Sequence, residues 1–263
     1  MNLSPIRFLD IQTTDLVYYD DDFRDVCFRF CQQRDIDCIP CLTNPKTFFR
    51  RTDEGFQEED ITPARLVDSQ ARIFEPAMLD RFHTNPILFV TTEGYLSGVV
   101  HFSDYNRPVV NEYLFRLISS YERSLRKLLC LQEWKNQDML DYFQKQIDTG
   151  QTKEAKAHYQ KKLSGYRKHQ AENEKLPAFE AFHLLDLIEF SQHHNVIEVH
   201  TEPNDLRNKI MHAHDLIHLD DPYRGDYIYT LTSFEEFFQQ VSVLLQDYQK
   251  VNNRIALYQL GAA

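Results

Sequence analysis

The feature that most constrains this chain is a change in the spacing of its apolar residues near residue 111. Before this point, short apolar runs alternate with polar turns, which is typical of β-strands. After it, apolar residues recur every three or four positions, as amphipathic helices require; the first such row is Leu114, Leu117, Ile118, Tyr121, Leu125, Leu128 and Leu129. The chain of 263 residues is long enough for two domains, so we expect an α+β protein with an α/β domain over 1–110 and an all-α domain over 111–263.

The first 110 residues contain an internal repeat, because Cys38–Asp53 aligns without a gap with Phe89–Asp104. The two segments read CIPCLTNPKTFFRRTD and FVTTEGYLSGVVHFSD. In each copy an apolar strand, a polar turn and a second apolar strand lead to an aspartate, and a helix-like stretch precedes the copy. The sequence therefore predicts two short α/β units in this domain.

This arrangement resembles a pair of cystathionine β-synthase (CBS) domains, the Bateman module. The family signature is Gly, two apolar residues, Thr, two further residues and Asp; here the copies run from Thr47 to Asp53 and from Gly98 to Asp104. Neither copy has the threonine, and the first also lacks the glycine. The resemblance implies that an adenine nucleotide binds in the cleft, with Asp53 and Asp104 accepting hydrogen bonds from ribose hydroxyls. A purely architectural role is the alternative.

The second domain is expected to be an up-and-down helical bundle with a lysine-rich helical insertion at about 136–175. A last helix is indicated by the capping-box pattern of Ser233 with Glu236. Residues 145–175 carry eight basic and four acidic residues, a local surplus in a chain of formal charge −11. Such a surplus can attract RNA, because phosphate binding is largely electrostatic. A solvated helix face is the alternative.

The segment DLRNKIMHAHDLIH, residues 205–218, has the most specific local pattern. Asn208 and His212 are four residues apart and share one helix face. The long side chain of Arg207 can reach the same place. The apolar residues on the other side predict a helix that packs on a core; they are Leu206, Ile210, Ala213 and Ile217.

Arg, Asn, three residues and His on a late helix of a bundle resemble the motif of the HEPN superfamily, over roughly residues 111–260. The resemblance implies a metal-independent endoribonuclease that acts as a homodimer with a composite site, in which Arg207, Asn208 and His212 are catalytic. Some HEPN toxins carry Tyr two positions after the His, where this chain has His214, so regulation through that tyrosine is not implied. Glu122 and Arg126, one turn apart on the first helix, either support the site or form an i,i+4 pair.

These residue types suit RNA cleavage, because RNA supplies its own nucleophile, the 2′-OH. Histidine can donate or accept a proton near neutral pH. Arginine can hold two non-bridging phosphate oxygens and stabilise the charge that develops on them. Asn208 can orient the imidazole or a phosphate oxygen. We therefore expect products with a 2′,3′-cyclic phosphate and a 5′-OH, and no cofactor in catalysis. A buried polar network or a surface salt-bridge patch is the alternative.

No metal site is expected from the clustered cysteines. Cys27, Cys31, Cys38 and Cys41 have a spacing that a zinc site can use, but they lie in apolar stretches where a free thiol packs as a small hydrophobe. No apolar run approaches the roughly 20 residues that span a bilayer, and the amino terminus lacks a secretory pattern, so we expect a cytoplasmic protein without a membrane partner.

Together these features predict an endoribonuclease that cuts RNA under the control of a ligand in the CBS-like domain. A role as a toxin or in defence is implied only by the resemblance to these families. Two alternatives remain open at this point. One is a non-catalytic, ligand-sensing regulator whose bundle serves dimerisation or partner binding, and the other is a HEPN protein that binds RNA without cutting it.

Overall fold

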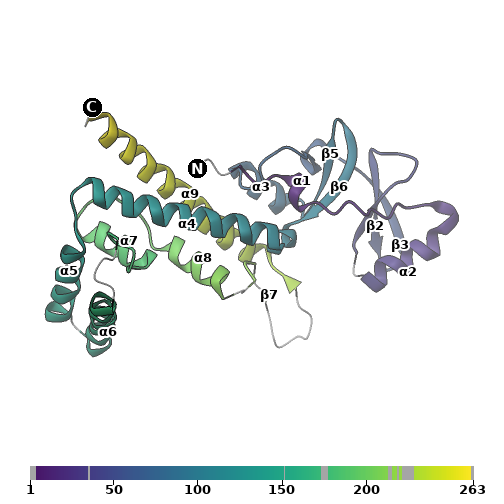
Figure 1. The fold of residues 1–263 in the computed structure, drawn as a ribbon. Coiled ribbons are helices and arrows are strands. Elements are labelled where there is room, and N and C mark those ends of the chain that lie inside the picture. The colour runs from purple at the N-terminus through teal and green to yellow at the C-terminus, as the bar shows by residue number, and fades with distance from the viewer. Residues whose placement is uncertain are drawn as a thin grey trace. The chain divides into compact units, whose positions relative to one another are not determined.

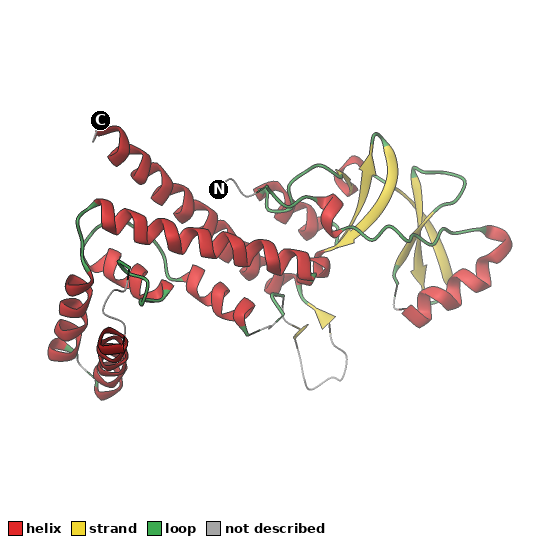
Figure 2. Ribbon diagram, viewed as in Figure 1, coloured by secondary structure: helices red, strands yellow, loops and turns green. Residues whose placement is uncertain are grey.

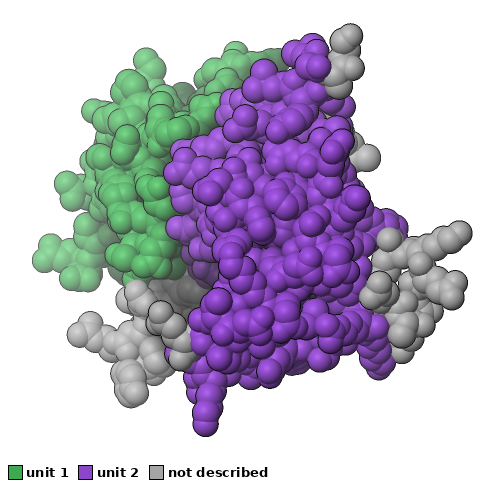
Figure 3. Space-filling view, turned by 90° about the vertical axis from the view of Figure 1, so that its left-hand side faces the viewer, with its two compact units in different colours: residues 1–113, 215–239 green, residues 114–214, 240–263 purple. Residues whose placement is uncertain are grey.

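The computed structural model describes residues 4–34, 36–150, 152–172, 177–212, 215–217, 219–220 and 228–261. Small sheets occupy the amino-terminal part and helices the carboxy-terminal part (Figures 1 and 2), which confirms the coarse α+β class. Contacts between residues divide the chain into two compact units, drawn in different colours in Figure 3. Unit 1 comprises 1–113 and 215–239, and unit 2 comprises 114–214 and 240–263. The segment 215–239, which we expected in the helical domain, thus belongs to unit 1.

The first sheet of unit 1 has three antiparallel strands in the order β1-β2-β3. A core forms where Cys27 and Cys31 of the preceding helix α2 pack with Tyr19 and Ile39. The ring of Tyr19 also stacks on Phe49, with 3.6 Å between ring centroids. The elements before and in this sheet are α1 (Phe8–Ile11), η1 (Asp21–Phe23), α2 (Arg24–Arg34), β1 (Cys38–Pro40), β2 (Thr47–Thr52) and β3 (Gly55–Asp60).

The second sheet has the order β4-β5-β6, with β4 parallel and β6 antiparallel to β5. Glu93 and Gly94 form the tight turn between β5 and β6, and both have positive φ angles, of 53° and 84°. Phe89 of this sheet shares a buried cluster with Phe48 and Ile61. The elements are η2 (Pro63–Arg65), β4 (Leu66–Asp68), α3 (Pro76–Thr84), β5 (Ile87–Thr92), β6 (Tyr95–His101) and η3 (Phe102–Asn106).

Both strand pairs that the internal repeat predicted are present, β1 with β2 and β5 with β6, and a helix precedes each pair. The copies differ after the second strand. In the first copy the chain turns at Asp53 and continues into β3, whereas in the second it continues into η3, which contains Asp104. The two aspartates therefore end equivalent strands in sequence but lie in different local structures.

Helices make up the described part of unit 2. The long helices α4 and α9 pack together: Tyr121 and Tyr248 meet edge to face, and the hydroxyl of Ser124 donates to the side-chain oxygen of Asn252 at 3.0 Å. Leu206 of α8 is fully buried in the same unit. The helices are α4 (Pro108–Leu131), α5 (Asn136–Thr149), α6 (Lys153–Glu172), α7 (Leu184–His193), α8 (Glu202–Met211) and α9 (Leu231–Gly261). The first residues of α4 (108–113) and of α9 (231–239) belong to unit 1.

Helix α8 is shorter than expected, because it ends at Met211 and does not continue to residue 218. The side-chain amide of Asn106 accepts from the backbone N–H of Ile217 and donates to its carbonyl, at 2.9 and 3.2 Å. These bonds satisfy a backbone that is not helical at this position. Leu219–Asp220 then forms strand β7, which pairs with β8 (Ile228–Tyr229). Ala213 of the expected apolar row lies outside the described residues.

In the part of the chain that the structure describes, no helix combines the length and the apolar character needed to cross a bilayer.

Candidate functional site

The carboxy-terminal end of α8 carries Arg207, Asn208 and His212. Leu206 is fully buried, which turns the helix so that Asn208 lies on its exposed side. The Arg207 side chain is 27% exposed. The structure thus brings the three predicted residues to one end of one helix, where a substrate can reach them.

His212 is the first residue after the last turn of α8. Its backbone N–H donates to the carbonyl of Asn208 at 3.1 Å, which keeps the two residues one turn apart although His212 has left helical geometry (φ −96°, ψ 10°). His212 is exposed. An exposed imidazole can exchange protons with a bound substrate, as general acid–base catalysis requires.

A pocket of about 210 Å³ lies beside Arg207, between α4 and α8. The Arg207 Nε lies 4.0 Å from the Glu122 Oε2, and its Nη1 donates to the Asn208 side-chain oxygen at 3.5 Å. Both contacts are long, so they guide the guanidinium without holding it rigidly. The pocket is lined by Phe115, Ile118, Ser119 and Glu122 of α4, and by Arg207, Ile210 and Met211 of α8.

Glu122 is held from the other side by Arg126. The two form an i,i+4 ion pair, and their side chains are 16% and 15% exposed. Arg126 also donates to the backbone carbonyls of Phe179 and Phe182, at 3.0 and 2.9 Å. The i,i+4 pair is thus present, and Glu122, unlike Arg126, lines the pocket beside Arg207. That the pair supports the site stays a prediction.

The balance of charge at this site favours an anion. Among the residues that line the pocket, Arg207 is the cation and Glu122 the anion; Arg126, outside the lining, pairs with Glu122, so the charge of Arg207 is only partly compensated. Because the pocket is partly enclosed, these charges are screened less than on an open surface. A phosphate group is therefore a suitable ligand for the open side of Arg207.

Helix α8 is attached to α9 at both of its ends. Before its first turn, the fully buried carboxylate of Asp247 accepts the backbone N–H of His200 at 2.7 Å and lies 3.0 Å from its Nδ1. In its last turn, Lys209 donates to the side-chain oxygen of Gln240 at 3.3 Å. These contacts set the position of α8 along α9. Sequence reasoning missed them, because His200 and Asp247 are far apart in the chain and neither lies in a motif.

Unit 1 contains a larger cavity, of about 720 Å³. Asp104 lines it, together with His101 and Ser103. Its walls come from residues 13 and 15–17, from residues 30, 34 and 36–40 in α2, in β1 and before β1, and from residues 87, 99 and 101–104. A cavity of this volume can enclose a small organic molecule.

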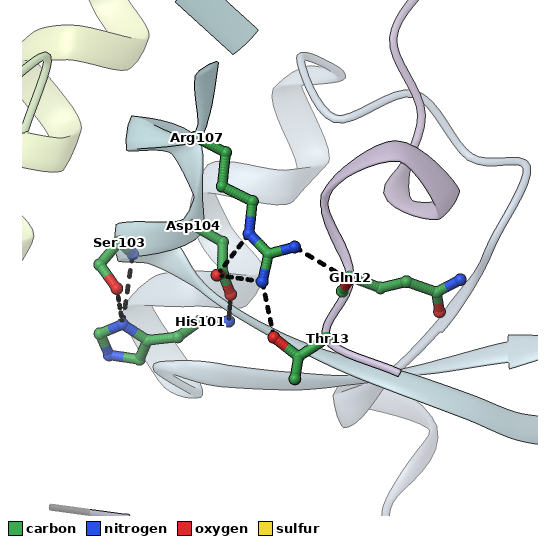
Figure 4. A network of polar contacts seen from close by, with 6 residues as sticks. All are labelled: Gln12, Thr13, His101, Ser103, Asp104 and Arg107. Carbon is green, nitrogen blue, oxygen red and sulfur yellow. Dashed lines mark hydrogen bonds and ion pairs between the residues drawn. The ribbon is translucent and has the colours of Figure 1, made fainter. Parts of the chain in front are cut away.

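The Asp104 carboxylate is the centre of a polar network (Figure 4). One oxygen accepts the backbone N–H of His101 at 2.8 Å, and the other accepts from Arg107 at 2.9 and 2.8 Å. Arg107 also donates to the Gln12 carbonyl at 3.0 Å and to the Thr13 hydroxyl at 2.6 Å. A carboxylate has about four lone-pair positions, so one of them is left for a ligand hydroxyl.

His101 stands where the CBS signature has its threonine. Its Nδ1 accepts from the backbone N–H of Ser103 at 3.2 Å and lies 2.7 Å from the Ser103 hydroxyl (Figure 4). Burial lowers the pKa of His101, against the opposing effect of Asp104. The ring is therefore neutral at pH 7, with its hydrogen on Nε2, and can donate to a ligand in the cavity. Sequence reasoning did not select His101, although its place in the signature pointed to it.

The structure does not bring Asp53 into this cavity. Asp53 lies exposed in the turn between β2 and β3, and it is not among the described residues that line the 720 Å³ space. Only one of the two aspartates expected to bind a nucleotide therefore faces the cavity.

Comparisons of the chain with protein-family models, with curated proteins and with solved structures found no match. The roles implied by the CBS and HEPN resemblances accordingly remain predictions from the residues and the geometry.

The clustered cysteines are free thiols. Burial raises the pKa of Cys31 to about 11 and that of Cys38 to about 12, as expected for thiols that pack among apolar residues. Across the described ranges, no group of three or more His, Cys, Asp or Glu residues is placed to hold a metal ion. His214 lies outside the described residues.

Proposed function

We propose that unit 2 is an endoribonuclease that cuts RNA through attack of the 2′-OH and needs no metal ion. The observation that carries the proposal is the grouping of Arg207, Asn208 and His212 at one accessible end of α8, where Arg207 also lines a pocket. The HEPN-like order of these residues in the sequence supports the same assignment.

Each residue has a defined task in the reaction. The 2′-oxygen attacks phosphorus and loses its proton to an imidazole, while the bond from phosphorus to the 5′-oxygen breaks and that oxygen takes up a proton. Arg207 binds the non-bridging oxygens, whose negative charge grows in the transition state. Asn208 orients the phosphate or the ring. The products are a 2′,3′-cyclic phosphate and a 5′-OH, so no water is consumed in this step.

A homodimer would supply the second proton-transfer group, because the step needs one base and one acid. Phe115 and Met211 line the Arg207 pocket, and they are 47% and 51% exposed. Exposed apolar side chains at one place are typical of surfaces that another protein covers. We therefore place a second copy of the chain at this edge of the site, with its own His212 facing the first.

The experiment compares the parent chain with His212→Ala on end-labelled RNA, with EDTA present. We expect the parent to cut and the variant to be at least about a hundredfold slower. A substrate with a 2′-deoxy residue at the cut site should resist, and cleavage of that substrate would refute the mechanism. RNA binding without turnover by the parent would instead identify an RNA-binding protein, and the absence of both would identify a non-catalytic regulator.

As a second function, we propose that the cavity of unit 1 binds a regulatory ligand, with an adenine nucleoside or nucleotide as the first candidate. Asp104 has an acceptor position left for a ribose hydroxyl, and His101 offers a donor. The lining also contains Asp15, Asp37 and one cation, Arg34, so phosphate groups are less favoured there than the nucleoside part.

Calorimetry with adenosine, AMP and ATP tests the regulatory ligand. Binding should weaken when His101 is replaced by Phe, and Asp53→Asn should leave it unchanged because Asp53 does not line the cavity. RNA cleavage rates with and without the bound compound would then show whether it activates or represses. Failure of all three compounds to bind would remove the nucleotide assignment.

A further inference from the structure

Helix α6 carries a strong excess of positive charge. From Lys153 to Lys168 it contains six basic residues and one acidic residue, Glu154, in a chain whose formal charge is −11. One of the six, Lys162, forms ion pairs within unit 2, with Asp186 and Glu189. The other five are Lys153, Lys156, Lys161, Arg167 and Lys168.

These five residues share one side of the helix. At about 100° per residue, their directions fall within a sector of about 140°, and Glu154 lies just outside it. Tyr166 points the other way, and Leu163 lies about 90° from the middle of this sector; both are buried in unit 2, with 6% and 5% exposure. We call the side defined by Lys153, Lys156, Lys161, Arg167 and Lys168 the basic face.

We propose that the basic face binds the phosphate backbone of an RNA strand, outside the pocket of Arg207. This inference rests on the proposed ribonuclease function. From Lys153 to Lys168 the helix rises by about 23 Å, a length over which a strand presents several consecutive phosphates. Small or polar residues, Ala157, Gln160 and Ser164, lie between the basic ones, so a strand can approach closely.

An RNA strand fits this face better than a membrane does. A helix that lies in a membrane surface needs a wide apolar side to insert. The apolar side of α6 is used within unit 2, where Leu163 and Tyr166 are buried, and the basic face itself contains no large apolar residue. The attraction is therefore electrostatic, and it should carry little base specificity.

The test uses the triple variant Lys153→Gln, Lys161→Gln and Arg167→Gln in the His212→Ala background, which does not cut the probe. Glutamine keeps helix propensity nearly unchanged. For an unstructured labelled RNA at low salt, we expect Kd to rise at least about tenfold, and the slope of log K against log salt to fall by about 2, at about 0.7 for each lost contact. The matched control is Lys46→Gln, Lys127→Gln and Lys135→Gln, which removes the same charge from other exposed positions.

The outcomes separate this inference from the ribonuclease proposal. With His212 restored, the triple variant should raise KM and leave kcat unchanged. If the parent cuts RNA and the triple variant binds and cuts as the parent does, the basic face is not the RNA path, although the nuclease stands. If the triple variant loses binding but the parent never cuts, the RNA path stands and the nuclease fails. An equal loss of RNA affinity in the control variant overturns the inference. Tighter binding of the His212→Ala protein to anionic vesicles than to RNA also overturns it.

Discussion

Glu122 faces Arg207 across the small pocket between α4 and α8, with 4.0 Å between the carboxylate and the guanidinium Nε. Arg126 holds the same carboxylate from within α4. The Glu122 carboxylate therefore contacts two arginines, Arg126, which also binds backbone carbonyls, and Arg207, which lines the pocket.

Glu122→Gln should lower the free energy of unfolding by about 1–3 kcal/mol, because Arg126 is largely buried and loses its charged partner. The rate of RNA cleavage should also fall, since Arg207 loses the carboxylate that orients its guanidinium. Chemical denaturation and the cleavage assay measure the two effects. Glu133→Gln, at an exposed position, serves as the control and should change neither quantity. An unchanged cleavage rate in Glu122→Gln would remove Glu122 from the site.

Arg207→Lys should slow cleavage by about a hundredfold or more, although it keeps the positive charge. An ammonium group cannot hold two phosphate oxygens as a planar guanidinium does. Single-turnover rates for the parent, Arg207→Lys and Arg207→Gln measure the difference. Equal rates for the parent and Arg207→Lys would show that only the charge matters.

Asp247→Asn should lower the free energy of unfolding by about 2–3 kcal/mol, because a fully buried carboxylate that binds both His200 groups loses its charge. The cleavage rate should fall with it, since α8 is no longer fixed at its start. Urea denaturation and the cleavage assay are the measurements. Asp205→Asn, on the exposed side of α8, provides the comparison and should be close to the parent.

Stability should decline as the pH falls below about 6.5, and His101 should contribute to the decline. Burial lowers the pKa of His101 in the folded chain, so the unfolded chain takes up a proton first. The stabilising effect is therefore complete above the unfolded pKa and is lost as the pH falls through the folded one. Urea denaturation at several pH values should show a shallower decline for His101→Gln. A decline equal to that of the parent would contradict this assignment.

Met211→Glu should convert a dimer into a monomer and abolish cleavage, because it places a charge among apolar side chains at the proposed contact. Sedimentation velocity and the cleavage assay follow the two properties together. Leu42→Glu, at a loop position where Leu42 is 57% exposed beside the polar Thr43 and Asn44, is the matched control. If Met211→Glu stays dimeric and active, the second copy does not bind at this edge.

The parts of the fold that follow from local spacing could be predicted from the sequence. The apolar row that begins at Leu114 predicted helix α4, and the repeat of Cys38–Asp53 in Phe89–Asp104 predicted two antiparallel strand pairs. Both patterns depend only on neighbours in the chain, so one sequence is sufficient to find them.

The errors arose where distant residues decide the local structure. The backbone of Ile217, where the sequence pattern predicted helix, is instead bound by Asn106, which is 111 residues away in the chain. Asp53 was expected in a ligand cleft, but the following segment forms strand β3 and places it in a turn. The contact of His200 with Asp247 joins positions 47 residues apart, and no spacing rule indicates it.

Helix α8 has only 10 residues, and a helix of this length is marginal by itself in water. Its helical conformation therefore depends on contacts with α9 at its start and end and with α4 in its middle. A synthetic peptide of residues 202–212 would be unstructured, and grafting Arg207, Asn208 and His212 onto another scaffold would not reproduce the site. A protein that keeps this site must therefore also keep the two long helices, α4 and α9, that contact α8.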